Sequence, residues 1–128
     1  MLETEKVIIR SFEDLRAWQE AHALVISIYK KTKDFPKEEV FGLTSQMRRA
    51  AVSIASNIAE GFSRKTPKDK SQFYAIGKGS LTELQSQLYV ARDVGYLSGE
   101  SCKTVLDQMY IVGRLLTGLQ KSMSNTQV

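Results

Sequence analysis

The chain has 128 residues, 42% hydrophobic and 25% charged, which is enough for one domain with a buried core. Its single cysteine, Cys102, excludes an intramolecular disulfide and a multi-cysteine metal site, and fits a cytoplasmic protein. The net charge of +4 is concentrated in residues 41–80, which hold seven Lys or Arg and two Asp or Glu, so these residues either attract a polyanion or keep the protein soluble.

Two helices are predicted in the first half of the chain. The first covers residues 12–33, because Ser11 with Asp14 three residues later is a helix-start signal and Pro36 follows the helix end. The second covers residues 43–64. The predicted apolar face of the first helix carries Leu15, Trp18, His22, Val25, Tyr29 and Thr32.

Two more helices are predicted in the second half, at 67–94 and 99–122. Thr66 and Pro67 form a start signal for the third helix, Gly95 supplies a left-handed residue at its end, and Ser98 caps the fourth. Short connections predict an all-α fold, an antiparallel up-down-up-down four-helix bundle, as a single domain over residues 1–128 with flexible ends at 1–10 and 124–128. The predicted apolar faces carry Phe73, Ile76, Ser80, Leu84, Leu88 and Ala91 on the third helix, and Cys102, Val105, Met109, Val112, Leu116, Leu119 and Met123 on the fourth.

The second helix carries a polar stripe and an unusually wide apolar arc. Ala55 and Ala59 extend the arc to roughly 200°, whereas facing one core needs roughly 100°. This width predicts a homo-oligomer, and the alternative is an alanine-rich, partly exposed face. The polar stripe comprises Gln46, Arg49, Ser53, Asn57, Glu60 and Arg64.

Asn57, Glu60 and Gly61 lie near the end of this helix, and their predicted role is structural. A half-buried Asn57 amide needs hydrogen-bond partners, and Glu60 can pair with Arg64 one turn on. We expect Asn57 and Glu60 to tie the helix end to a neighbouring helix or subunit, and Gly61 to relax the helix or permit close packing.

A resemblance to a known family covers nearly the whole chain. Residues 46–65, QMRRAAVSIASNIAEGFSRK, and 73–97, FYAIGKGSLTELQSQLYVARDVGYL, resemble the four-helix-bundle proteins encoded in intervening sequences of bacterial large-subunit ribosomal RNA genes. The fit extends back through residues 15–43. The resemblance implies an up-down bundle that assembles into a ring, often a homopentamer. A related branch, the accessory variability protein of diversity-generating retroelements, is a basic pentamer that binds nucleic acid and its reverse transcriptase.

No pattern in the chain indicates an enzyme, a metal site, a cofactor or a membrane span. His22 is the only histidine and fits a core position better than a ligand or a base. Gly77 to Ser80 lack the earlier glycine of a phosphate-binding loop and fall inside a helical pattern. The first residues carry acids and no long apolar run, so no signal peptide is expected.

Two functions remain open at this point. The first is a non-enzymatic ring that binds RNA or DNA through a basic surface with little sequence specificity. The second is a protein-interaction scaffold whose charge serves only solubility. The predicted nucleic-acid-binding residues are Arg48, Arg49, Arg64, Lys65, Lys68 and Lys70, which Lys78, Arg92 and Arg114 could join in a bundle.

Overall fold

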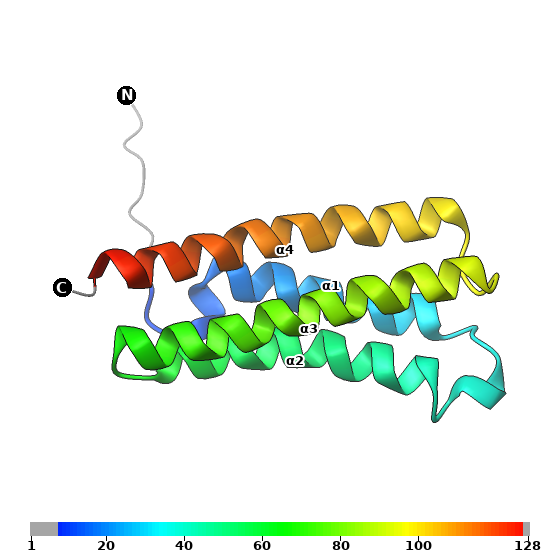
Figure 1. Cartoon of the computed structure of the whole chain (residues 1–128), viewed down its shortest axis with the longest axis horizontal. Coiled ribbons are helices and arrows are strands. Elements are labelled where there is room, and N and C mark those ends of the chain that lie inside the picture. Colours follow the sequence, from blue (N-terminus) through cyan, green and yellow to red (C-terminus); the bar gives the residue numbers. More distant parts are fainter. Residues whose placement is uncertain (1–7, 127–128) are drawn as a thin grey trace.

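Four α-helices lie along one long axis in the computed structural model, which describes residues 8–126 (Figure 1). They are α1 (Arg16–Thr32), α2 (Leu43–Ser63), α3 (Pro67–Asp93) and α4 (Gly99–Thr126). The 3₁₀ turn η1 (Phe12–Asp14) precedes α1, and η2 (Lys37–Glu39) lies between α1 and α2. No strand occurs within residues 8–126, and each helix runs opposite to the one before it. The predicted all-α four-helix bundle is confirmed.

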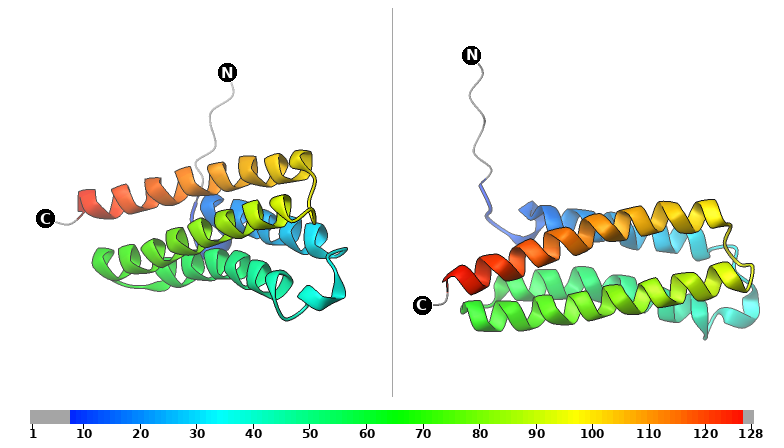
Figure 2. Two further views of the ribbon diagram at one scale, coloured as in Figure 1. Left: turned by 45° about the vertical axis from the view of Figure 1, so that its right-hand side comes forward. Right: turned by 45° about the horizontal axis from the view of Figure 1, so that its top comes forward.

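The four helices of the chain surround one core, and each packs against two neighbours (Figure 2). α1 packs against α2 and α4, and α3 packs against the same two helices, so α1 and α3 are diagonal. The predicted seam of α4 is confirmed, with its first five members buried and Leu119 and Met123 packed against the core. The largest fully buried side chains include Leu24, Ile28, Met47, Ile54, Ile58, Tyr74, Leu84, Leu88 and Leu116.

Local signals set most of the helix ends correctly. The Thr66 hydroxyl accepts a hydrogen bond from the Asp69 amide at 3.1 Å, with Pro67 at the first helical position. Gly95 has φ +89°, the left-handed geometry expected of a residue that ends a helix. The Ser98 hydroxyl accepts from the Ser101 amide at 3.0 Å.

The two outer helix ends differ from the prediction. Ser11 and Asp14 form their capping box around η1, and Leu15 is then extended, so α1 begins only at Arg16. α4 continues to Thr126, and residues 124–126 are therefore helical. Residues 1–7 and 127–128, which hold most of the expected flexible ends, lie outside the described residues.

The predicted apolar face was wrong in parts of α1 and α3. In α1, His22 and Tyr29 are exposed, and His22 stacks on Trp18 at 4.8 Å instead of entering the core. The small side chains of Ala17 and Ala21 are buried in their place, because small residues let neighbouring helices approach closely. In α3, Tyr74 and Gly77 are buried, whereas Ile76 is 54% exposed and Phe73 half-buried.

Glu39 holds together the end of the bundle opposite the chain termini. Its Oε1 accepts a hydrogen bond from the Leu43 amide at 3.1 Å, which caps α2, and its Oε2 accepts from the Tyr96 hydroxyl at 2.9 Å. The pKa of the Glu39 carboxyl is lowered chiefly by the hydrogen bond from the Leu43 amide and secondly by the one from Tyr96. The same bond raises the pKa of Tyr96, whose ring lies 5.3 Å from that of Phe35.

Glu39→Gln is expected to lower the free energy of unfolding near pH 7 but to have little effect near pH 3. A lowered pKa in the folded state stabilises the protein above the unfolded pKa of about 4.3, and this stabilisation is lost as the pH falls through the folded pKa. Urea unfolding of both proteins at the two pH values, followed by circular dichroism, measures the difference. An equal difference at both values would contradict a role for the carboxylate charge.

Candidate nucleic-acid interface

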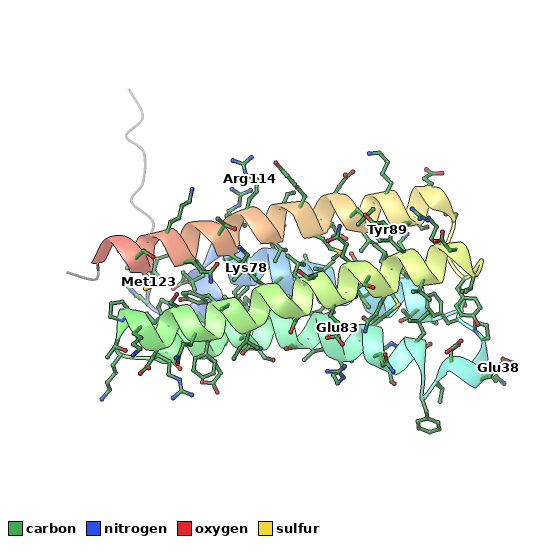
Figure 3. All side chains as sticks on the ribbon, in the orientation of Figure 1. Glu38, Lys78, Glu83, Tyr89, Arg114 and Met123 are labelled. Carbon is green, nitrogen blue, oxygen red and sulfur yellow. The ribbon has the colours of Figure 1, made fainter. Side chains whose placement is uncertain are left out.

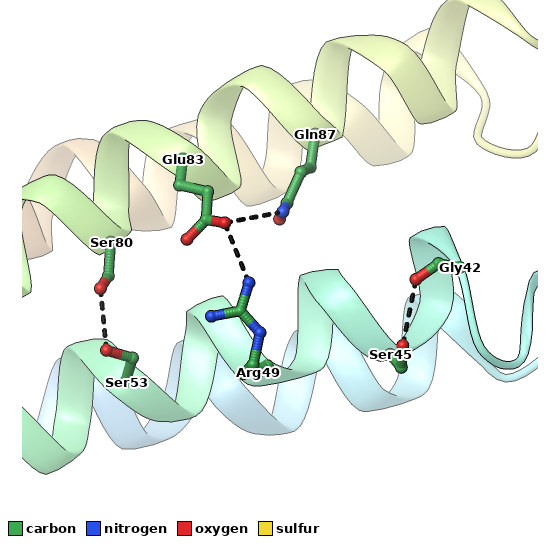
Figure 4. A network of polar contacts seen from close by, with 7 residues as sticks. All are labelled: Gly42, Ser45, Arg49, Ser53, Ser80, Glu83 and Gln87. Atoms are coloured by element: carbon green, nitrogen blue, oxygen red, sulfur yellow. Dashed lines mark hydrogen bonds and ion pairs between the residues drawn. The ribbon is translucent and has the colours of Figure 1, made fainter.

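The polar stripe of α2 faces α3 and forms a polar seam between the two helices (Figure 4). Arg49 Nη2 lies 3.1 Å from Glu83 Oε2, and Gln87 Nε2 donates to the same oxygen at 3.4 Å. The Ser53 and Ser80 hydroxyls share a hydrogen bond of 2.8 Å. Arg49 is thus partnered inside the protein, and the seam fixes how α2 lies along α3.

Asn57 belongs to this seam, and its amide is used within α2. Its Nδ2 donates to the carbonyl oxygen of Ser53 at 2.8 Å and to the Ser53 hydroxyl at 3.1 Å. A Cβ atom added at Gly77 of α3 would lie 3.6 Å from the Asn57 Cβ, so the backbone of α3 passes close by. Both Nδ2 bonds stay within the helix of Asn57, whereas we expected this amide to tie the helix end to a neighbouring helix or subunit.

Gly61 is where α2 and α3 come closest. It is buried, and a Cβ there would lie 2.5 Å from Tyr74 Cε1, so close packing is its role. Lys70 Nζ donates to the carbonyl oxygens of Phe62 at 2.5 Å and Gly61 at 3.5 Å, and thereby caps the carboxyl end of α2. Burial raises the pKa of Tyr74.

Three cations are presented by the turn between α2 and α3, and we call Arg64, Lys65 and Lys68 the basic turn. Arg64 pairs with Glu60 at 3.3 Å, as predicted, and its guanidinium lies 4.4 Å from the Phe73 ring centre. Both partners of this pair are about half exposed, so it contributes little stability. Lys65 and Lys68 are exposed and have no side-chain partner among residues 8–126.

Arg48 and Arg49 lie apart from the basic turn, roughly 22 Å along α2 at 1.5 Å per residue. Arg48 Nε donates to the Thr32 hydroxyl at 2.9 Å, and its guanidinium lies over the Tyr29 ring at 4.6 Å. Of the six predicted binding residues, the structure therefore brings Arg64, Lys65 and Lys68 together. It places Lys70 beside them in a capping role and uses the other two in packing.

Antiparallel pairing adds two cations from α4, Arg114, which the sequence analysis allowed to join the basic residues, and Lys121. The second half of α4 lies beside the first half of α3 (Figures 1 and 3). Residues 64–82 and 108–124, which we call the basic end, hold seven Lys or Arg and one carboxylate, Asp69, and the Glu60 carboxylate adjoins them through its ion pair with Arg64. Lys121 was missed altogether, although the absence of acids from residues 108–128 was a visible signal.

The predicted interface residues Ala55 and Ala59 pack mainly within the chain. Ala55 is only 8% exposed and belongs to the hydrophobic core, and Ala59 is half-buried. α2 contacts α1, α3, η1 and η2, so its wide apolar arc is largely covered without a second subunit. Val52 stays 39% exposed on the outer side.

Two further features bear on the class of site. Among residues 8–126, no group of three or more His, Cys, Asp or Glu side chains is placed to hold a metal ion. Nor does any helix of that part of the chain combine the length and apolarity that crossing a membrane requires.

Comparison with known proteins identifies a family and a similar fold. Residues 13–118 match the model of a family described as 23S rRNA-intervening sequence protein. No curated protein matches the chain. A crystal structure of a protein of unknown function from the S23 ribosomal protein family, from Bacteroides thetaiotaomicron VPI-5482, is similar with a TM-score of 0.75 and 17% identity. The match covers 82% of this chain and 95% of that one, and at this identity it establishes the fold alone.

Gly61→Ala is expected to destabilise the protein by about 1–3 kcal/mol, because the added methyl group overlaps the Tyr74 ring. The matched control is Gly79→Ala in α3, where a Cβ meets nothing within 4 Å. There the better helix propensity of alanine should stabilise by about 0.5–1 kcal/mol. Urea unfolding measures both, and a stabilised Gly61→Ala variant would show that α2 and α3 are not in tight contact at this point.

Proposed function

Because the chain belongs to the 23S rRNA-intervening sequence protein family, we propose that it is a non-enzymatic, ring-forming helical-bundle protein that binds RNA or DNA through a basic surface with little sequence specificity. The observation that carries this proposal is the basic end. Its seven Lys or Arg outnumber Asp69 and the adjoining Glu60 by five, compared with a net charge of +4 for the whole chain. An excess of positive charge on one part of a protein surface attracts a polyanion.

The basic turn is the part of this surface best suited to phosphate. Lys65 and Lys68 have no competing partner within residues 8–126, so a phosphate contact there breaks no ion pair inside the protein. Each such contact releases counterions from the nucleic acid and makes the affinity depend on salt. Contacts to the phosphate backbone carry no sequence information, which accounts for the low specificity of the proposed binding.

Lys65→Gln with Lys68→Gln is expected to weaken binding of single-stranded RNA and to make its salt dependence shallower. The slope of log Kobs against log salt is negative, and loss of two phosphate contacts reduces its magnitude by about 1.4, at about 0.7 per contact. Fluorescence anisotropy across a salt series measures this slope.

The control for this experiment removes the same charge elsewhere. Lys33 and Lys37 are exposed at the opposite end of the bundle, so Lys33→Gln with Lys37→Gln should bind like the wild type. Wild-type protein that binds no nucleic acid at low salt, or equal losses in the two double variants, would overturn the proposed site.

The proposed ring, five-fold by family resemblance, needs an apolar contact between copies. Just before α2, Phe41 is 94% exposed and Val40 is 50% exposed. Val40, Tyr29 and Val52 help to line a surface hollow of about 410 Å³, together with Arg48 and Arg49. We call Tyr29, Val40, Phe41 and Val52 the apolar patch. An exposed patch of large apolar side chains is a feature of interaction surfaces, and the same observation favours the alternative function, a scaffold that holds a partner protein.

Light scattering coupled to size exclusion should show a mass of several chains for the wild type. Val40→Ser with Phe41→Ser is expected to lower this mass, because the exposed side chains contribute little to the folded monomer. The control is Val90→Ser with Val94→Ser, which removes two side chains of 49% and 55% exposure at the carboxyl end of α3. A wild-type monomer at every concentration would refute the ring. Wild-type binding of a protein but of no nucleic acid would support the scaffold instead.

A further inference from the structure

A groove of about 680 Å³ runs between α3 and α4, on the side of the bundle away from α1 and α2. Figure 3 shows Lys78 and Tyr89 in the space between these two helices, with Arg114 on the outer side of α4. The part of the groove lined by Lys78, Arg114, Gly118 and Lys121 falls within the basic end. The lining residues on which the argument below depends are Lys78 and Tyr89 from α3, and Tyr110, Arg114, Gly118 and Lys121 from α4.

The groove has three cations and no carboxylate in its lining. Lys78 Nζ donates to the Thr117 hydroxyl at 3.2 Å and so keeps two of its three hydrogens for other acceptors. Neither Arg114 nor Lys121 forms an ion pair within residues 8–126. Because no acid balances these charges, the groove attracts an anion.

Aromatic rings lie between the cations and the far end of the groove. Tyr110 is 61% exposed, and the Arg114 guanidinium lies 5.9 Å from its ring centre. Tyr89 is half-buried, with the Arg92 guanidinium 4.9 Å from its ring centre. Tyrosine rings beside arginine in a positively charged groove are the surfaces on which unpaired bases stack.

Gly118 leaves the groove open where the cations are. A Cβ added there would meet nothing within 4 Å, so the packing of the chain does not require glycine. Glycine weakens the interior of a helix relative to alanine, and it is favoured where another backbone approaches closely. The open space at Gly118 therefore suits a chain lying in the groove.

We propose that the groove between α3 and α4 binds a single strand of RNA or DNA, with bases against Tyr89 and Tyr110 and phosphates near Lys78, Arg114 and Lys121. This inference rests on the proposed function and names the form of nucleic acid that it takes. A duplex keeps its bases stacked and paired, so it offers phosphates to the basic turn but no base faces to the tyrosines. A second copy of this chain, which itself carries +4, complements the charge of the groove less well than a polyphosphate.

The test compares two glycine-to-leucine variants of equal charge. Gly118→Leu fills the groove, whereas Gly79→Leu places the same side chain in open space on α3, outside the groove lining. The probes are a labelled oligouridine of about 20 nucleotides and an RNA duplex of the same length, measured by fluorescence anisotropy. Gly118→Leu should weaken oligouridine binding at least about fivefold and leave duplex binding within about twofold of the wild type, and Gly79→Leu should change neither.

A second pair of variants tests whether bases stack on Tyr110, and it decides the question if Gly118→Leu does not fold. Tyr110→Leu keeps an apolar side chain but removes the aromatic face, and should weaken oligouridine binding about fivefold or more. Tyr110→Phe keeps the ring and should bind like the wild type. Equal binding by Tyr110→Leu and Tyr110→Phe would overturn the stacking.

The outcomes separate this inference from the proposed function. Wild-type protein that binds neither probe overturns both. Wild-type protein that binds, with Gly118→Leu binding oligouridine equally well, overturns the groove as a strand site and leaves the basic turn as the binding surface. A change of oligomeric mass in Gly118→Leu but not in Gly79→Leu would show that the groove is a contact between copies and would likewise overturn it.

Discussion

The close approach of α2 and α3 is the constraint on which the rest of the structure depends. It exists because Gly61 leaves room for the Tyr74 ring. Short polar side chains, Ser53 and Ser80, also meet across this contact. The tight pair holds the turn that joins it at the end of the bundle, where the cations of the turn point into solvent.

Sequence signals with a local cause predicted the helices and most of their ends. Thr66 with Pro67 and the left-handed Gly95 act on their own backbone, so each can be recognised without knowing the fold. The rotation of α1 was not predictable in this way, since Trp18 and His22 form an apolar-looking face that lies at the surface. Which face of a helix enters the core depends on the neighbouring helices. In the sequence of α1, the large side chains of Trp18 and His22 suggest an apolar face more strongly than the small Ala17 and Ala21, which are the residues that are buried.

The candidate site was predicted in part for the same reason. Lys65 and Lys68 could be recognised because they lie three residues apart in sequence and have no partner within residues 8–126. Arg48 could not be recognised as a packing residue, since its partner Thr32 lies on another helix. The contribution of Lys121 also depends on pairing, because only the antiparallel arrangement of α3 and α4 brings it to the basic end. Positive charge in this protein is therefore of two kinds, one that holds helices together and one that remains available.

The three-residue connection between α2 and α3 has a consequence for the order of folding. Closing so short a loop costs little conformational entropy, and the contacts it permits between adjacent helices are close in sequence. The α2–α3 hairpin is therefore the part of the bundle that can form first, ahead of the longer closure that brings α1 against α4. Since the basic turn is the tip of that hairpin, we expect its cations to be displayed before the groove beside α4 forms.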